Sequence, residues 1–257
     1  MFPIGDDNSD RSRTPVVNYL LIGINIFVFI FLQQMGNDID FTYSYSTVPA
    51  EIVTGADVIT PAETERNPYT GERFYRPGLG ETGVHVWLTL IISMFMHGGW
   101  AHLGGNMMYL WVFGDNLENR LGHLRYLMFY LVTGIIASLV HVFTTQFMGH
   151  DMYIPSLGAS GAISGVLGGY MLLYPTRAVH LFVVFTIITV PSIVALGLWI
   201  VFQIINGMGA LGGSEAGGVA YSAHIGGFIA GLILIKFFAA GTQAAETRRS
   251  RGLRRGF

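Results

Sequence analysis

Long apolar stretches separated by short polar segments are the main pattern along this chain. A helix that crosses a bilayer needs roughly 20 mostly apolar residues, and six stretches meet or approach that length. They are Val16–Gln34, Ala101–Leu117, Tyr126–Gln146, Ala159–Tyr174, Val179–Ile205 and Ala223–Ala239. The pattern therefore predicts an all-α membrane protein of six transmembrane helices, with a long, membrane-associated first connection.

Two of these stretches and the first connection need comment. Val16–Gln34 resembles a signal peptide in position, but it is long and no small-residue cleavage site follows, which favours an uncleaved anchor. Pro191 lies inside the fifth stretch and predicts a kink there. Within the first connection, the apolar segment His85–Met96 suggests a short amphipathic helix on the membrane surface.

The basic residues predict the orientation of the six helices. Eleven of the fourteen Lys and Arg residues fall on the side that holds both termini, which makes that side cytoplasmic. They are Arg11, Arg13, Arg120, Arg125, Arg177, Lys236, Arg248, Arg249, Arg251, Arg254 and Arg255; the outer side holds Arg66, Arg73 and Arg76. We expect a cytoplasmic tail at 1–15, a membrane domain at 16–239 and a basic cytoplasmic tail at 240–257, in a multi-pass protein of the cell (inner) membrane.

The amino-acid composition agrees with a membrane domain and excludes any reaction or site that needs cysteine. Charged residues make up 12% of the 257 residues, against about 25% in an ordinary soluble domain. The 34 glycines suit close packing of membrane helices. The net charge of −2 gives no reason to expect a nucleic-acid partner, and the absence of cysteine excludes disulfides, thiolate metal sites and cysteine nucleophiles.

Three segments place polar side chains where apolar ones are expected, which makes them functional candidates in a membrane. They are His97–Asn106, Gly158–Gly165 and Ala223–Gly231. With a rise of about 1.5 Å per residue, His102, Ser160 and His224 all lie roughly 20 Å from the cytoplasmic ends of their helices. In a hydrocarbon core about 30 Å thick, this common level is about 10 Å below the outer surface.

The residue types at this level fit nucleophilic catalysis. We expect the loop of residues 147–157 to dip inward, so that Ser160 begins a helix whose free N–H groups stabilise an anion. A serine nucleophile needs a base, and His224 lies at the same depth. His102 and Asn106, four residues apart, share one helix face and can donate hydrogen bonds to the same oxyanion.

Small residues at every fourth position explain how these helices can approach each other. They form two stripes: Gly161, Gly165 and Gly169, and Ala223, Gly227 and Gly231. We expect the two stripes to face each other. Each feature alone has an ordinary explanation, because such stripes are common in membrane packing and a serine in a helix usually bonds its own backbone. The ordinary explanations do not predict a common depth for all the polar residues.

The three segments resemble the rhomboid family of intramembrane serine proteases, over nearly all of residues 16–239. The matching positions are His97, His102 and Asn106; Gly158 to Gly161 as Gly-x-Ser-Gly; Ala223, His224, Gly227 and Gly231 as Ala-His-x-x-Gly-x-x-x-Gly; and Phe113–Glu118 with Gly122, Arg125 and Tyr130 at the junction of the second and third helices.

The resemblance implies an endopeptidase that cleaves single-span membrane proteins near the outer end of their transmembrane segment. It implies a Ser160–His224 dyad, and an oxyanion hole made by the Ser160 N–H, His102 and Asn106. The supporting residues would be His97, Gly158, Gly161, Gly227 and Ser164. Many family members have an aromatic residue four positions after the nucleophile, where it stacks on the catalytic histidine. Here that position is Ser164, so we expect another interaction, such as a hydrogen bond, to orient His224.

Other functional classes have less support in the sequence. An inactive family member that binds client proteins is the alternative, but such relatives usually lack the serine or the histidine. A transporter would favour charged residues at the midplane and related halves, which are not found. No His-Glu-x-x-His motif occurs, which disfavours a zinc protease. We therefore expect no metal and no cofactor, with the lipid bilayer and single-span substrates as partners.

Overall fold

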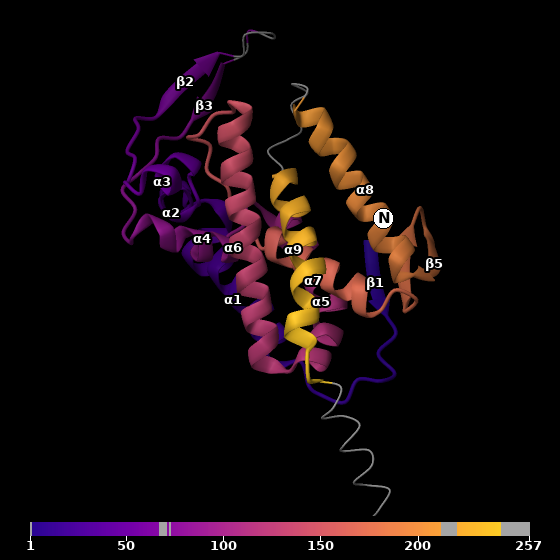
Figure 1. Cartoon of the computed structure of the whole chain (residues 1–257). Helices are drawn as coiled ribbons and strands as arrows, with labels where there is room; N and C mark the ends of the chain where they lie inside the picture. Colours follow the sequence, from indigo (N-terminus) through magenta and orange to yellow (C-terminus); the bar gives the residue numbers. More distant parts are fainter. Residues whose placement is uncertain (1, 67–70, 72, 212–219, 243–257) are drawn as a thin grey trace, which may run out of the picture.

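The computed structural model describes residues 2–66, 71, 73–211 and 220–242, and most of them are helical (Figure 1). The N-terminal half contains β1 (Phe2–Asp6), α1 (Val16–Phe27) and its π-helical continuation (Val28–Leu32), a 3-10 turn (Gln34–Gly36), α2 (Ile39–Tyr45), α3 (Pro49–Thr54), β2 (Glu63–Arg66), β3 (Arg73–Arg76), and a helical segment made of Val86–Leu88, α4 (Thr89–Ile92) and Ser93–Phe95. The rest comprises α5 (Trp100–Leu121), α6 (His123–Met148), α7 (Ser160–Leu173), β4 (Ala178–Val183), β5 (Thr186–Pro191), α8 (Ser192–Leu211) and α9 (Tyr221–Ala239).

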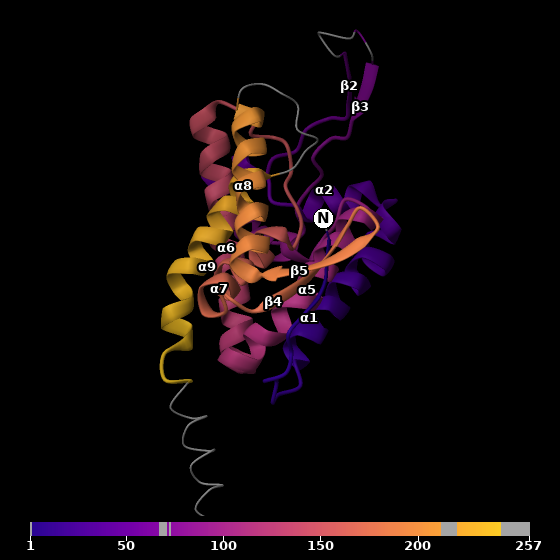
Figure 2. The ribbon, with the colours of Figure 1, turned by 90° about the vertical axis from the view of Figure 1, so that its right-hand side faces the viewer.

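Helix α7 lies at the centre of the bundle. It packs against α5, α6, α8 and α9, and all residues from Gly161 to Tyr170 are buried. The two views show α6 and α9 running along the bundle beside it, with α1 to α4 on one flank and α8 on the other (Figures 1 and 2). A residue on α7 is therefore enclosed by protein on several sides.

Several helices have the length and composition of membrane spans. Within the described residues, α6 and α9 are long and apolar enough to cross a bilayer, and a third span results if Val86–Phe95 and Trp100–Leu121, bent by 80°, are counted together. Shorter apolar helices cover Val16–Leu32, Ser160–Leu173 and Ser192–Met208. The chain is thus mostly helical, and five of the six apolar stretches found in the sequence coincide closely with helices.

The fifth stretch was predicted wrongly. Val179–Ile205 is not one kinked helix, because its first half forms the antiparallel hairpin β4–β5 and only Ser192 onward is helical. Pro191 ends β5 instead of kinking a helix. The hairpin sequence is rich in β-branched and aromatic residues, as strands are. Its turn, Val184-Phe185, has positive φ at both positions without the usual Gly or Asn, so the sequence gives no turn signal.

The N-terminal tail is also more ordered than a simple tail, and the description of the fold as all-α needs correction. Strand β1 pairs with β4, which gives a three-stranded sheet in the order β1–β4–β5. A second, two-stranded sheet joins β2 and β3 in the first connection. The apolar segment His85–Met96 does form a short helical unit, as expected.

Buried polar side chains near the end of α5 anchor the N-terminal segment. The carboxylate of Glu118 is fully buried and accepts hydrogen bonds from the backbone N–H groups of Val17 (2.9 Å) and Asn18 (2.7 Å), which lie at the start of α1. Asn18 in turn donates to the carbonyl of Leu110 (3.0 Å) and accepts from the Tyr126 hydroxyl (2.7 Å). These contacts fix α1 against α5 and α6.

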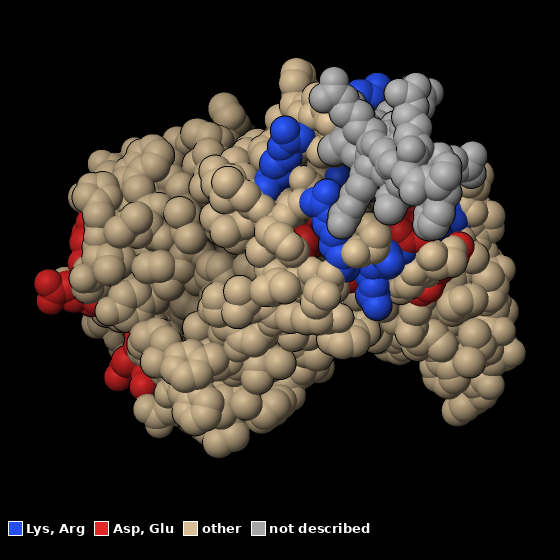
Figure 3. All heavy atoms as spheres, turned by 90° about the horizontal axis from the view of Figure 1, so that it is seen from below, with Lys and Arg blue, Asp and Glu red and all other residues tan. Residues whose placement is uncertain are grey.

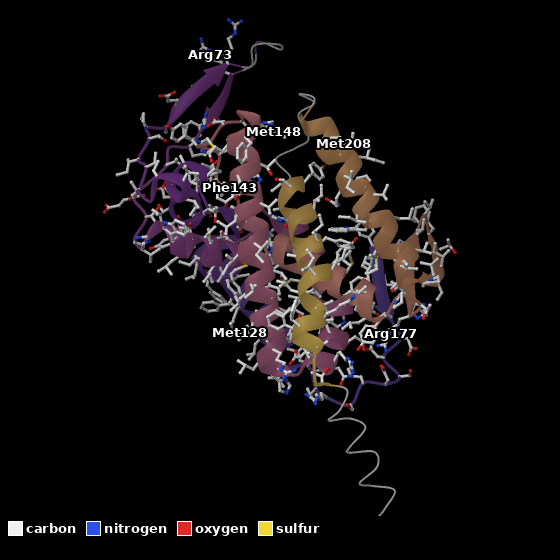
Figure 4. All side chains as sticks on the ribbon, in the orientation of Figure 1. Arg73, Met128, Phe143, Met148, Arg177 and Met208 are labelled. Atoms are coloured by element: carbon white, nitrogen blue, oxygen red, sulfur yellow. The ribbon has the colours of Figure 1, made fainter. Side chains whose placement is uncertain are left out.

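Basic residues gather at the same end of the bundle. Figure 3, seen from below, shows Lys and Arg atoms beside acidic ones on this face. Arg11 pairs with Asp115 at 2.6 Å, and Arg177, labelled near the lower end in Figure 4, donates to Asn116 at 2.7 Å. Met148 and Met208, on α6 and α8, lie at the opposite end (Figure 4). The Arg-rich part of the predicted C-terminal tail lies outside the described residues.

Glycines bring the backbones of α7 and α9 into direct contact. A Cβ atom at Gly227 would lie 2.2 Å from the carbonyl oxygen of Gly161, and one at Gly231 would lie 2.1 Å from that of Gly165. The stripe on α9 therefore faces α7 as predicted. The stripe on α7 is placed differently from the prediction, because Cβ atoms at Gly161 and Gly165 would point first at side chains of α6, and one at Gly169 would lie between Phe129 of α6 and Ile235 of α9. It is the α7 backbone that meets α9.

This packing predicts that the same substitution, glycine to alanine, changes the stability of the protein differently at two positions. Gly227→Ala should destabilise the protein by about 1–3 kcal/mol, because the new methyl group collides with a backbone carbonyl that cannot rotate away. Gly23→Ala on α1 meets no atom within 4 Å and should be neutral or slightly stabilising, since alanine favours helix. Thermal unfolding in detergent measures both. Equal unfolding temperatures for the two variants would contradict the backbone contact.

Candidate active site

Ser160 is the first residue of α7, as the sequence predicted. No side chain caps this helix start, and the first intrahelical bond is donated by Ile163, to the carbonyl of Ala159 at 2.9 Å. The N–H groups of Ser160, Gly161 and Ala162 therefore have no partner within the helix. Such a helix start can accept an anion.

The loop before Ser160 is held by its glycine. Gly158 has φ +126°, which disfavours any residue with a side chain, and its N–H donates to the carbonyl of Ser93 at 2.9 Å. The loop begins at Gly149, since α6 extends through Met148, slightly further than expected. The contact with Ser93 ties the loop to the helical segment that precedes α5.

His224 lies in the first turn of α9, and its ring is held by α8. The Nδ1 atom is 2.8 Å from Oε1 of Gln203. The ring of Trp199, also on α8, lies 6.0 Å from the imidazole ring, centre to centre. With the carboxamide oxygen facing the ring, Gln203 accepts the hydrogen bond and Nδ1 carries the proton. The other ring nitrogen, Nε2, is then free to accept a proton.

Ser160 on α7 and His224 on α9 each adjoin a small residue that faces the other helix. A Cβ atom at Gly161, next to Ser160, would lie 3.9 Å from Cβ of Ala223, next to His224. Among the described residues, no hydrogen bond joins the Ser160 hydroxyl to the imidazole. Catalytic hydrogen bonds are often long before substrate binds, so this geometry is compatible with a serine–histidine pair.

The ring of His102 lies against the loop that carries Ser160. A Cβ atom at Gly158 would lie 2.9 Å from Nε2 of His102 and 3.7 Å from the Ser160 hydroxyl oxygen. The N–H of Gly98 donates to Nδ1 of His102 at 3.3 Å. In a neutral imidazole the proton is then on Nε2. This atom is therefore a hydrogen-bond donor on the side of Gly158 and Ser160.

Asn106 is one helical turn after His102 on α5 and is buried. Its side-chain nitrogen has no hydrogen-bond partner in the described part of the chain. A buried donor without a partner costs about 1–3 kcal/mol, so such a group calls for a functional explanation. A transient anion beside His102 would supply the missing acceptor.

His97 contacts His102 and is itself held by Gln33. Its ring contacts that of His102 edge-on, with centres 5.1 Å apart. Its backbone is held on both sides by Gln33, which accepts from the His97 N–H (2.8 Å) and donates to the His97 carbonyl (3.0 Å). Gln33 was not among the residues predicted from the sequence. The only signal was a polar residue at the end of the first apolar stretch.

Ser164 does not contact His224 through a hydrogen bond. Its hydroxyl donates to the carbonyl of Ser160 at 2.6 Å, within α7. The hydrogen bond of the His224 ring is instead to Gln203, a residue that was not predicted from the sequence.

A cavity opens beside Ser160 between α6, α7, α9 and the loop. Most of its lining residues are small. They include Ser93, Gly134, Ser138, His141, Ser156, Gly158, Gly161, Ala162, Ala220 and Ala223. Within the described residues, no group of three or more His, Asp and Glu side chains lies close enough together to hold a metal ion.

The Rhomboid domain model matches residues 84–240, which is more than half of the chain. The chain belongs to the rhomboid family. It is 32% identical over 171 residues to Rhomboid protein 1, mitochondrial, of Saccharomyces cerevisiae, covering 66% of this chain and 47% of that protein. It is 29% identical over 233 residues to Rhomboid protease GluP of Bacillus subtilis, covering 90% of this chain and 35% of that protein. The matches thus span less than half of these relatives' own length.

Membership in this family implies a multi-span membrane protein, in agreement with the apolar helices. The matched region also includes the residues gathered around Ser160. The rhomboid match contains His97, His102, Asn106, Ser160 and His224, all between residues 84 and 240.

Proposed function

We propose that this chain is an intramembrane serine endopeptidase with a Ser160–His224 dyad. The observation that carries the proposal is the start of α7, where a serine stands at an uncapped helix N-terminus beside the donor nitrogen of His102. The unpartnered amide of Asn106 adds a second side-chain donor. Such donors would stabilise the oxyanion of acyl transfer.

The proposed reaction has two halves. His224 takes the hydroxyl proton of Ser160 at Nε2 while the serine oxygen attacks the carbonyl carbon of the scissile peptide. The resulting oxyanion accepts hydrogen bonds from the Ser160 N–H, His102 and Asn106. The C–N bond then breaks, and His224 gives its proton to the leaving amine. In the second half, His224 takes a proton from water as the water oxygen attacks the acyl carbon; the ester C–O bond breaks, and His224 returns the proton to the Ser160 oxygen.

The length of α7 supports a site below the membrane surface. Its 14 residues span roughly 21 Å, which is shorter than a hydrocarbon core of about 30 Å. If the helices of the bundle cross the membrane, with α8 in place of the full fifth stretch and the basic end of the bundle in the cytoplasm, Ser160 lies about 10 Å below the outer surface. Both termini would then be cytoplasmic, with residues 16–239 as the membrane domain of an inner-membrane protein.

A site at this depth suits single-span membrane proteins cut near the outer end of their span. A transmembrane helix must unwind before its backbone fits an active site, and exposing unpaired backbone groups to lipid costs several kcal/mol each. Water that reaches Ser160 from the outer side reduces this cost. The small residues around the cavity favour a small side chain beside the cleaved bond. The connection between α8 and α9 follows Leu211, where α8 ends, and its residues 212–219 lie outside the described part of the chain.

The proposal predicts that either member of the dyad is indispensable. The purified protein in detergent or liposomes should cleave a single-span substrate that has Gly or Pro near the outer end of its span. Ser160→Ala and His224→Ala should each abolish cleavage, because a serine without a base is a weak nucleophile. Product formation is followed by gel and mass spectrometry.

A matched control is Ser222→Ala, a hydroxyl on α9 that bonds His141 instead, and it should remain active. Normal turnover by the Ser160→Ala protein would refute the dyad. Substrate binding without cleavage by the wild-type protein would favour the alternative, a scaffold that binds client proteins.

If Asn106 belongs to the oxyanion hole, replacing it should lower activity without lowering stability. Asn106→Leu should lower kcat by about 10- to 100-fold, less than the 10²–10³ lost with one donor in a well-studied soluble protease, because two donors remain. The unfolding temperature should stay the same or rise, since the substitution removes a buried donor without a partner. Kinetics and thermal unfolding test the two effects. A large loss of stability with unchanged kcat would show that Asn106 is structural.

A further inference from the structure

We infer that Gln203 is a positioning residue that fixes the tautomer and the orientation of His224. The inference rests on the proposed function, because it assigns a partner to the proposed base. It starts from the 2.8 Å contact between Oε1 of Gln203 and Nδ1 of His224, which joins α8 to α9.

The placement of Gln203 is unusual for its helix. The side chains on either side of it, Phe202 and Ile204, are exposed, whereas Gln203 is 6% exposed and faces the bundle. Burying an amide in an apolar span is unfavourable unless it is hydrogen-bonded. The hydrogen bond to His224 offsets the unfavourable burial of the Gln203 amide, so Gln203 and the imidazole are paired inside the bundle.

The chemistry of the amide determines which nitrogen of His224 is basic. Oε1 of Gln203 accepts but cannot donate, so the proton lies on Nδ1 and the lone pair on Nε2. The two nitrogens occupy different corners of the ring, so Nε2 points away from α8. In serine proteases with a triad, an aspartate holds the histidine in this same way. A neutral amide sets the tautomer without adding a charge to the apolar surroundings.

Other neighbours of His224 do not provide this interaction. Ser164 bonds the carbonyl of Ser160, and Ser222 is 3.0 Å from Nδ1 of His141. Trp199 lies one turn before Gln203 on the same helix, and its ring is tilted by 39° to that of His224. It limits rotation of the imidazole but leaves the choice of nitrogen open. Gln203 thus bonds one edge of the imidazole, and the ring of Trp199 lies beside it.

Two substitutions of Gln203 by side chains of similar length distinguish a role in positioning His224 from a role in packing. Gln203→Met keeps the volume but removes the acceptor, whereas Gln203→Glu keeps an oxygen that accepts from Nδ1 in either protonation state. The methionine variant should lose about 10- to 100-fold in kcat with little change in KM, a part of the 10²–10⁴-fold that a positioned base contributes. The glutamate variant should retain kcat within a few-fold. Asn206→Leu, three residues further along α8, where the side chain bonds its own helix, should leave kcat unchanged.

The protonated nitrogen can be observed without activity. In protein labelled with ¹⁵N-histidine, the His224 signal, assigned by its absence in His224→Gln, should show a proton on Nδ1 in the wild type. In Gln203→Met this signal should shift toward a mixture of tautomers. Full kcat with an unchanged signal in Gln203→Met would overturn the inference, as would equal losses of kcat in the methionine and glutamate variants. If the wild-type protein cleaves nothing, the proposed function fails, while the histidine signal still decides the role of Gln203.

Discussion

The contact between the backbones of α7 and α9 is the constraint on which the rest of the site depends. Short side chains such as serine and histidine can meet across two helices only if the helix axes come unusually close. Gly227 and Gly231 allow this by resting directly on the carbonyl oxygens of Gly161 and Gly165. Any larger residue would separate the proposed nucleophile from its base before affecting either residue itself.

The remaining helices hold these two in register through polar contacts near their ends. The start of α8 is tied to the turn that follows α7, since the N–H of Ser192 donates to the carbonyl of Arg177 at 2.8 Å. This anchor sets the height of α8 and therefore of Gln203 beside His224. On the other side, Gln33 holds the backbone of His97, whose ring contacts that of His102. The two histidines proposed for catalysis, His224 and His102, are thus each supported by a second element.

Much of the site was predictable from the sequence because its signals are local. Ser160 at a helix start and His102 with Asn106 on one helix face follow from spacing, and the resemblance to rhomboid proteases assigned their roles. The partners that orient them were not predictable in this way. Gln203 and Gln33 are single polar residues in or beside apolar stretches, and only the fold shows that each meets a histidine far away in the sequence.

The fold departed from the prediction in the apolar run after Arg177, where the length of the run favours a helix and its residue types favour strands. The apolar run after Arg177 has the length of a membrane helix, yet its β-branched residues favour strands, and β1 supplies a pairing partner from the other end of the chain. Hydropathy alone does not distinguish these outcomes, because it counts apolar residues without regard to long-range pairing. The consequence for function is that α8 begins only at Ser192.

Covalent labelling tests the central claim, that a base activates Ser160, without the need for a known substrate. An activated fluorophosphonate is incubated with the protein in detergent, and the modified peptide is identified by mass spectrometry. The account predicts one adduct, on Ser160, that forms much more slowly in His224→Ala. No adduct on folded protein, an adduct on another serine, or an unchanged rate without His224 would contradict it.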